Sequence, residues 1–321
     1  MNELVRQLIR HVCDGDIRRA QQQARLVLNH NATKKDEQFK ENMLRKLDAK
    51  GNLIELPQHL RALLVAEDAS DFPEARFLLR KEEEEAVAKV MALYRASERL
   101  AELGIPYLPA LILHGQSGCG KTMLARYIAH RAGLPFVYVQ FSNLVSSYLG
   151  STQANIAKVF EYVRTAPCVL CFDELDAVGM ARGQAGDVRE MDRIVIALMQ
   201  ELDRLPNNVI IVGTTNRFDR LDPALVRRFP LQYELKALSF RDAAELANRF
   251  FAYTGTETSG WLSEWCAKMF GETVPASTVV RECTAVVVQK VLAEQKGQGR
   301  IDMDEFHKNF CGNCGTKMDT E

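Results

Sequence analysis

Residues 115–122 have the composition and spacing of a loop that binds phosphate groups. They are Gly115, Gln116, Ser117, Gly118, Cys119, Gly120, Lys121 and Thr122, which fit the pattern G-x-x-x-x-G-K-[ST]. In such a loop, backbone N–H groups surround the phosphates, the lysine supplies positive charge, and the threonine hydroxyl is a ligand for Mg²⁺. An apolar run at 111–113 precedes the loop and a helical pattern at 123–132 follows it. Because strand, loop and helix occur in the required order, we predict a nucleotide site with Mg²⁺ rather than a glycine-rich turn that binds nothing.

Two acidic residues end a second apolar run, at 168–172. Asp173 is placed to hold the Mg²⁺ shell, and Glu174 is placed to turn a water molecule toward the γ phosphate. The alternative is that the two acids only end the strand. Their spacing from Lys121 is typical of a phosphate-loop sheet, so we predict hydrolysis of the nucleotide as well as binding.

A third apolar run, at 209–214, leads into Thr215, Asn216 and Arg217, and the segment 222–229 ends in Arg227, Arg228 and Phe229. With these motifs in this order, the chain resembles the AAA+ ATPases, and most closely the AAA branch that remodels proteins. The resemblance covers about residues 66–292. It implies ATP as the substrate, Asn216 as the sensor of its γ phosphate, and a homo-oligomer, a hexamer in most of the family.

The adjacent arginines are the part of the pattern that depends on this oligomer. The resemblance implies that Arg227 and Arg228 reach the nucleotide of the neighbouring subunit, and it leaves open which of the two is the arginine finger. The family's usual spacing of these arginines is shortened here, as in the severing and membrane-scission AAA enzymes.

Tyr148, Leu149 and Gly150 match the loop that lines the central pore of AAA hexamers. An aromatic ring on a glycine-hinged loop can grip an extended polypeptide without reading its sequence. The alternative is that Tyr148 packs under the sheet. A glycine-rich stretch at 179–187 lies where the family has a second pore loop. The resemblance therefore implies a protein client, and any peptide cleavage would need a separate peptidase, because the chain has no protease motif.

Alternation of apolar runs with helical patterns predicts an α/β fold, a P-loop NTPase parallel sheet flanked by helices. The expected strands are 111–114, 135–140, 169–172, 209–214 and 231–235. Helical patterns at 241–254, 260–270 and 277–294 predict a C-terminal lid, and those before residue 51 predict a small helical domain. We predict an N-terminal helical adaptor or docking domain at 1–51, the large ATPase subdomain at 52–236, the lid at 237–305 and a tail at 306–321.

The charge balance disfavours partners that are bound through a large electrostatic field. The chain has 41 Lys and Arg against 42 Asp and Glu, a formal net charge of −1, so a nucleic acid or an anionic membrane would need a local patch. The sequence shows no signal peptide and no apolar run long enough to span a membrane. The chain has eight cysteines and a predicted nucleotide site, so we expect reduced thiols and a cytoplasmic protein.

Cys311 and Cys314 form a C-x-x-C pair in the tail. Zinc usually takes four ligands and only His307 lies near in sequence, so we favour two free thiols over a zinc site. Two rival functions on the same fold stay open. They are a nucleic-acid motor or loader, which the charge and Tyr148 disfavour, and a slow regulatory ATP switch, which Glu174 and Arg227 disfavour.

Overall fold

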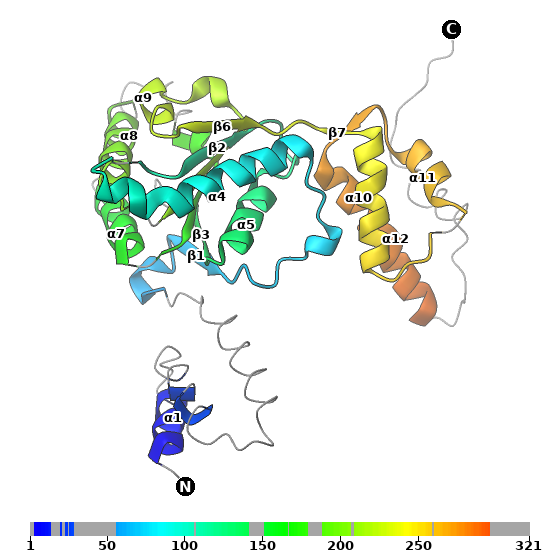
Figure 1. Cartoon of the computed structure of the whole chain (residues 1–321). Coiled ribbons are helices and arrows are strands. Elements are labelled where there is room, and N and C mark those ends of the chain that lie inside the picture. The colour runs from blue at the N-terminus through cyan, green and yellow to red at the C-terminus, as the bar shows by residue number, and fades with distance from the viewer. Residues whose placement is uncertain are drawn as a thin grey trace. The chain divides into compact units, whose positions relative to one another are not determined.

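A computed structural model of the chain describes residues 3–13, 20, 23–24, 26–28, 56–105, 107–140, 151–165, 167–178, 188–206, 209–258 and 260–295 (Figure 1). The chain divides into two compact units. The sheet unit comprises Met1–Phe72, Lys81–Gly115 and Lys121–Leu235, and the helical unit comprises Pro73–Arg80, Gln116–Gly120 and Lys236–Glu321. Within the described ranges, no helix combines the length and the apolar character that a membrane crossing requires.

The sheet unit alternates strands and helices along the chain. Its strands are β1 (Leu64–Glu67), β2 (Ala110–His114), β3 (Phe136–Gln140), β4 (Val169–Asp173), β5 (Ile210–Thr215) and β6 (Leu231–Glu234). Its helices are α1 (Glu3–Cys13), α4 (Lys81–Glu102), α5 (Lys121–Ala132), α7 (Ser151–Thr165), α8 (Val188–Leu202) and α9 (Pro223–Val226). Three short 3₁₀ helices join them in the described ranges, namely η1 (Gln58–Leu60), η3 (Leu175–Val178) and η4 (Phe218–Arg220).

The six strands form one sheet in the order β1-β3-β4-β5-β2-β6. The five strands from β2 to β6 run parallel, as expected from the sequence. The edge strand β1 was not predicted, and it pairs antiparallel with β3, Leu64 opposite Val139. The strand has only four residues and begins with Leu64, which is buried, and Val65, which is exposed. Four residues are too few for the alternation of apolar and polar side chains to predict a strand.

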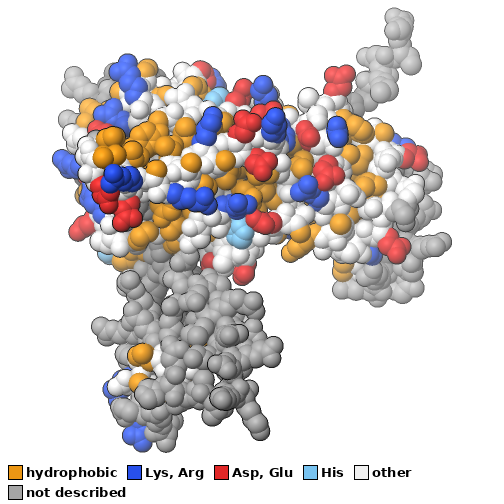
Figure 2. All heavy atoms as spheres, in the orientation of Figure 1, with side chains coloured by type: hydrophobic (Ala, Val, Ile, Leu, Met, Phe, Trp, Pro, Cys, Tyr) orange, Lys and Arg blue, Asp and Glu red, His pale blue; other side chains and the backbone are white. Residues whose placement is uncertain are grey.

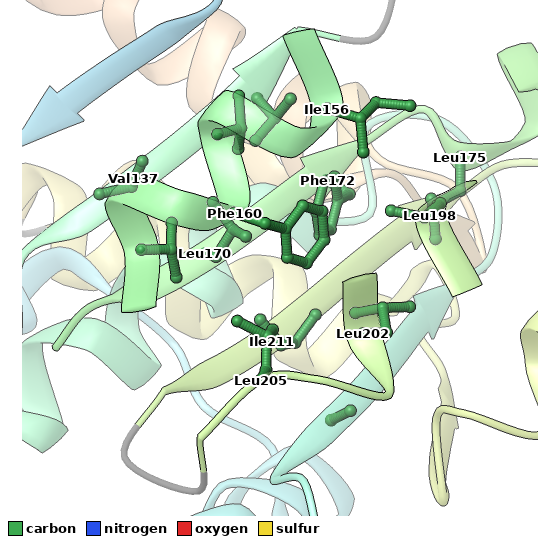
Figure 3. Close-up of a cluster of buried hydrophobic side chains, with 14 of the residues drawn as sticks. Val137, Ile156, Phe160, Leu170, Phe172, Leu175, Leu198, Leu202, Leu205 and Ile211 are labelled. Atoms are coloured by element: carbon green, nitrogen blue, oxygen red, sulfur yellow. The ribbon is translucent and has the colours of Figure 1, made fainter. Parts of the chain in front are cut away.

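Helices cover both faces of the sheet (Figure 1). On one face, α7 and α8 pack on the alternate strand residues Leu170, Phe172 and Ile211, and Phe160 of α7 stacks near Phe172 with ring centroids 5.8 Å apart (Figure 3). Successive side chains of a strand point to opposite faces, so Cys171 is buried on the other side, which α5 contacts. Burial on both faces explains why the central strands are continuous apolar runs.

The helical unit contains the three helices that the sequence predicts for a lid. They are α10 (Phe240–Tyr253), α11 (Leu262–Met269) and α12 (Ala276–Gln295), and a two-stranded ribbon of β7 (Leu238–Ser239) and β8 (Thr273–Val274) joins them, with η2 (Glu74–Arg76) before them in the chain. Phe251, Trp265 and Phe270 lie at the centre of its core in edge-to-face contacts. Arg80 donates to the backbone carbonyls of Lys236 and Ala237, which fixes the segment that leads into β7.

The predicted N-terminal domain is described only in part, and the predicted tail lies outside the described residues. Near the N-terminus, the Gln23 amide donates to the carbonyl of Leu4 and to the side chain of Gln7 on α1, at 3.2 and 3.1 Å. These two bonds connect the segment that contains Gln23 to α1. The rest of the predicted domain at 1–51, from residue 29 on, and the tail at 306–321 lie outside the described residues, so the boundaries of both domains stay predictions.

Candidate nucleotide site at the carboxyl ends of the strands

The candidate site lies where three neighbouring strands of the sheet end. Strands β4, β5 and β2 are adjacent and parallel, so their carboxyl ends meet at one edge, where open α/β sheets bind ligands. Asp173 is the last residue of β4, Asn216 follows β5, and the phosphate-loop pattern begins directly after β2 at Gly115. Segments that are about 100 residues apart in sequence are thereby brought to one place.

Lys121 connects two of these strand ends. Its ammonium group donates to the carbonyl of Gly115 at 2.9 Å and to Oδ1 of Asn216 at 2.8 Å. The side chain is 8% exposed and stands at the first residue of α5, where the helix dipole adds positive potential. The lysine predicted to bind phosphate and the asparagine predicted to sense it are therefore in direct contact.

Asp173 accepts hydrogen bonds on both carboxylate oxygens. Thr122 and Thr214 donate to Oδ1, the former at 3.3 Å, and Tyr138 donates its phenol proton to Oδ2 at 2.9 Å. Thr122 Oγ1 and Asp173 Oδ1 are oxygen ligands of the kind that Mg²⁺ prefers, and they lie close enough to contact one ion. The pair therefore fits the Mg²⁺ site predicted from the sequence.

Glu174 has an unusual backbone conformation. Its φ of 55° makes it the one described non-glycine residue with positive φ, a conformation that costs a side-chain-bearing residue about 1–2 kcal/mol. Its N–H donates to the hydroxyl of Thr214, which itself donates to Asp173. One threonine of β5 therefore holds both acidic residues, and strain of this kind is concentrated at functional sites.

The residue before Asn216 is fixed in a similar way. The Thr215 hydroxyl donates to the buried carboxylate of Asp176 at 3.0 Å and accepts from the N–H of Arg217 at 2.9 Å. Asn216 is thus held between two residues whose positions are set by one hydroxyl. Asp176 lies two residues after Glu174, and the sequence predicted no role for it. None was predicted for Tyr138, Thr214 or Thr215.

The phosphate-loop backbone requires glycine at its first position. Gly115 has φ 135°, and a Cβ atom there would lie 2.1 Å from the carbonyl oxygen of Leu235. The predicted loop residues Gln116 to Gly120 group with the helical unit, where the carbonyl of Gly118 accepts from the N–H of Ser277 at 2.9 Å. Cys119 within this segment is 4% exposed. The loop is therefore tied to the first turn of α12.

His114 lies at the end of β2, directly before the loop. Its ring stacks on that of Phe218, two residues after Asn216, with centroids 4.4 Å apart and an interplanar angle of 25°. Burial lowers the pKa of His114, with a raising effect of Glu234 and a lowering effect of Lys121. At Tyr138, burial is the main cause that raises the pKa, followed by the hydrogen bond to Asp173. Both groups therefore favour their uncharged forms near neutral pH.

Arg227 and Arg228 follow α9, a short helix capped by Asp222. Among the described residues, neither arginine contacts Lys121, Asp173 or Glu174 of the same chain. Arg228 forms an ion pair with Asp203, which raises its pKa, whereas Arg227 is exposed. The predicted pore residues Tyr148, Leu149 and Gly150, the glycine-rich stretch at 179–187, and Cys311 and Cys314 all lie outside the described residues.

Residues 111–237 match the model of the ATPase family associated with various cellular activities (AAA). The chain carries an AAA ATPase domain. Its curated relatives include an uncharacterized AAA family ATPase, y4kL, of Sinorhizobium fredii, 38% identical over 42% of this chain and 41% of that protein. They also include the peroxisomal ATPase PEX6 of Homo sapiens, 45% identical over 36% of this chain and 12% of the relative. The chain thus spans less than half of the length of these relatives.

Proposed function

We propose that the chain is an ATPase that works as a homo-oligomer and uses ATP hydrolysis to remodel protein clients. The observation that supports this most strongly is the gathering of Lys121, Thr122, Asp173, Glu174 and Asn216 at one edge of the sheet, together with the AAA domain at 111–237. Those residues come from three separate motifs, and a glycine-rich turn without a ligand would not require their convergence.

The roles of the residues follow from their contacts. Lys121 places its ammonium group beside the first residue of the phosphate loop, where it pairs with the β and γ phosphates of ATP. Thr122 and Asp173 would hold Mg²⁺, which would supply positive charge to offset that of the phosphates. Glu174, held by Thr214, orients the attacking water and accepts its proton. Asn216 contacts Lys121 and can therefore report the γ phosphate to β5.

We further propose that the chain forms a ring with a central pore that takes a protein client. An arginine of the pair Arg227 and Arg228 would complete the site of the next subunit, for which a hexameric ring is the expected assembly. Tyr148, Leu149 and Gly150 would grip a polypeptide client in the pore, with or without a separate peptidase. The curated relatives include ATPases named as peroxisomal. For this chain we expect the cytoplasm.

Each of the two rival functions is disfavoured by one feature of the chain. Figure 2 shows acidic and basic side chains interspersed over the face that it draws, whereas a nucleic-acid motor would need a basic stripe along the strand it binds. A slow regulatory switch would not need an intact carboxylate at Glu174, directly after the Asp173 that fits the Mg²⁺ site.

The test is a pair of substitutions at the site. Lys121→Ala should abolish ATP binding, since it removes the side-chain charge that faces the phosphates. Glu174→Gln should bind ATP and fail to hydrolyse it, because the substitution keeps the Cβ atom, and hence the backbone strain, while removing the carboxylate. Glu102→Gln, at an exposed ion pair at the end of α4, is the matched control and should turn over like the wild type. Wild-type turnover by Glu174→Gln would disprove the assigned role.

A further inference from the structure

The two adjacent arginines have different environments. The Arg228 guanidinium donates from Nε to Asp203 Oδ1 at 3.1 Å, from Nη2 to Asp203 Oδ2 at 2.9 Å, and from Nη1 to the carbonyl of Ala224 at 2.8 Å. All three of its nitrogen atoms therefore have partners in the same subunit. Within the described part of the chain, the exposed guanidinium of Arg227 has neither a hydrogen bond nor an ion pair.

The Asp203–Arg228 pair joins two helices. Asp203 follows the last residue of α8, and its N–H donates to the carbonyl of Met199 at 3.0 Å, which holds it on the final turn. Arg228 lies two residues after α9 and also bonds back to Ala224 within α9. The bidentate geometry fixes both the distance and the angle between the two helix ends.

Buried anchors on both sides of Arg227 restrict where it can point. Leu225 is 1% exposed and Phe229 is fully buried, and both belong to the core on the α7 and α8 face. With Arg228 held by Asp203, the backbone from 225 to 229 has fixed points before and after Arg227. Its side chain is left as the one guanidinium of the pair that can bind a phosphate without first breaking bonds.

We propose that Arg227 alone supplies the arginine finger, and that Arg228 is a positioning residue which, with Asp203, forms a brace inside its own subunit. The inference rests on the proposed function in one respect, namely that the nucleotide is shared between subunits. It decides which of the two arginines is the finger, a choice that the resemblance leaves open. It also gives Asp203, which had no predicted role, a specific effect on turnover.

A double-mutant cycle in the full-length protein separates a brace from a second finger. Arg227→Ala should lower the ATP turnover number on the order of 10³-fold or more with little change in KM, as expected for a lost finger. Arg228→Ala and Asp203→Ala should each lower it about 10- to 100-fold, because a misplaced Arg227 loses orientation. The double variant should be no slower than either single one, since both substitutions break the same bond.

The matched control is Arg204→Ala, which removes an exposed arginine next to Asp203 and should leave turnover unchanged. Amide exchange of the peptide 223–229 gives a readout independent of activity. It should increase equally in Arg228→Ala and Asp203→Ala and stay at the wild-type level in Arg227→Ala. Two results would overturn the brace. One is an Asp203→Ala variant that matches the wild type in turnover and exchange. The other is a double variant in which Arg228→Ala lowers turnover, relative to Asp203→Ala, by the same factor as it does in the wild type.

The result is distinguishable from failure of the proposed function. A wild-type chain without ATP turnover, or with full turnover as a dilute monomer, would contradict the shared ATPase site. The exchange measurement would still decide whether Asp203 and Arg228 brace α8 against α9.

Discussion

Replacing Tyr138 by Phe should weaken Mg²⁺ binding without preventing hydrolysis. Tyr138 gives Asp173 Oδ2 its hydrogen bond at 2.9 Å, while Thr122 and Thr214 donate to Oδ1. A hydrogen bond to a charged group contributes about 1.5–3 kcal/mol, and residues that orient a metal ligand change metal affinity about 10- to 100-fold. Because two donors still hold Oδ1, we expect Mg²⁺ affinity to fall by the lower end of that range, about tenfold, which corresponds to ~1.4 kcal/mol.

The effect can be measured as Mn²⁺ binding, followed by electron paramagnetic resonance in the presence of a non-hydrolysable ATP analogue. The Mg²⁺ concentration that half-saturates turnover should rise by the same factor, while the turnover number at saturating Mg²⁺ stays near that of the wild type. Tyr94→Phe is the matched control, since it removes a half-buried tyrosine hydroxyl that has no hydrogen-bond partner in the described ranges. If folded Tyr138→Phe bound Mn²⁺ with unchanged affinity, Tyr138 would not position Asp173.

Two further predictions concern the strand end that leads into the phosphate loop. Gly115→Ala should destabilise the protein by about 1–3 kcal/mol in a denaturant titration and weaken ATP binding, because its Cβ would lie 2.1 Å from the Leu235 carbonyl. Gly133→Ala, also at positive φ but with open space around it, should keep ATP affinity, and equal loss in both variants would contradict the clash. His114 has its pKa lowered by burial below its ordinary 6.5, so the unfolded chain takes up its proton first and stability falls as the pH drops through 6.5. The urea midpoint of the wild type should therefore fall more than that of His114→Gln between about pH 7.5 and 5.5, and identical shifts would show that His114 does not contribute.

The sequence predicts those parts of the site whose residues are adjacent in the chain. The phosphate loop requires a strand, a glycine-rich turn and a helix in direct succession, and the acids and Asn216 each follow an apolar run at once. Tyr138 could not be predicted in this way, because its contact with Asp173 depends on the register of β3 against β4, in which Gln140 lies opposite Asp173. The alternation of side chains along β3 does not specify which neighbour a tyrosine will reach.

The division between the arginines was equally beyond the sequence. Arg227 and Arg228 are the same residue type at adjacent positions, and their difference arises from Asp203, which lies 25 residues before Arg228. Antiparallel β1 was missed because it has four residues and a sheet position that no local pattern encodes. Long-range register and contacts, rather than local preference, decided these features.

The strand order has a consequence for how the protein is made. The interior strand β2 is complete at residue 114, but it pairs with β5 and β6, which end at residues 215 and 234. The side chains of Leu111, Ile112 and Leu113 are fully buried in the finished sheet. During synthesis, about a hundred further residues must be added after β2 before either of its neighbouring strands exists. Domains with such distant pairings fold slowly and expose unpaired strand edges meanwhile. The nascent chain is therefore most prone to aggregation, and most in need of a chaperone, between the emergence of β2 and that of β6.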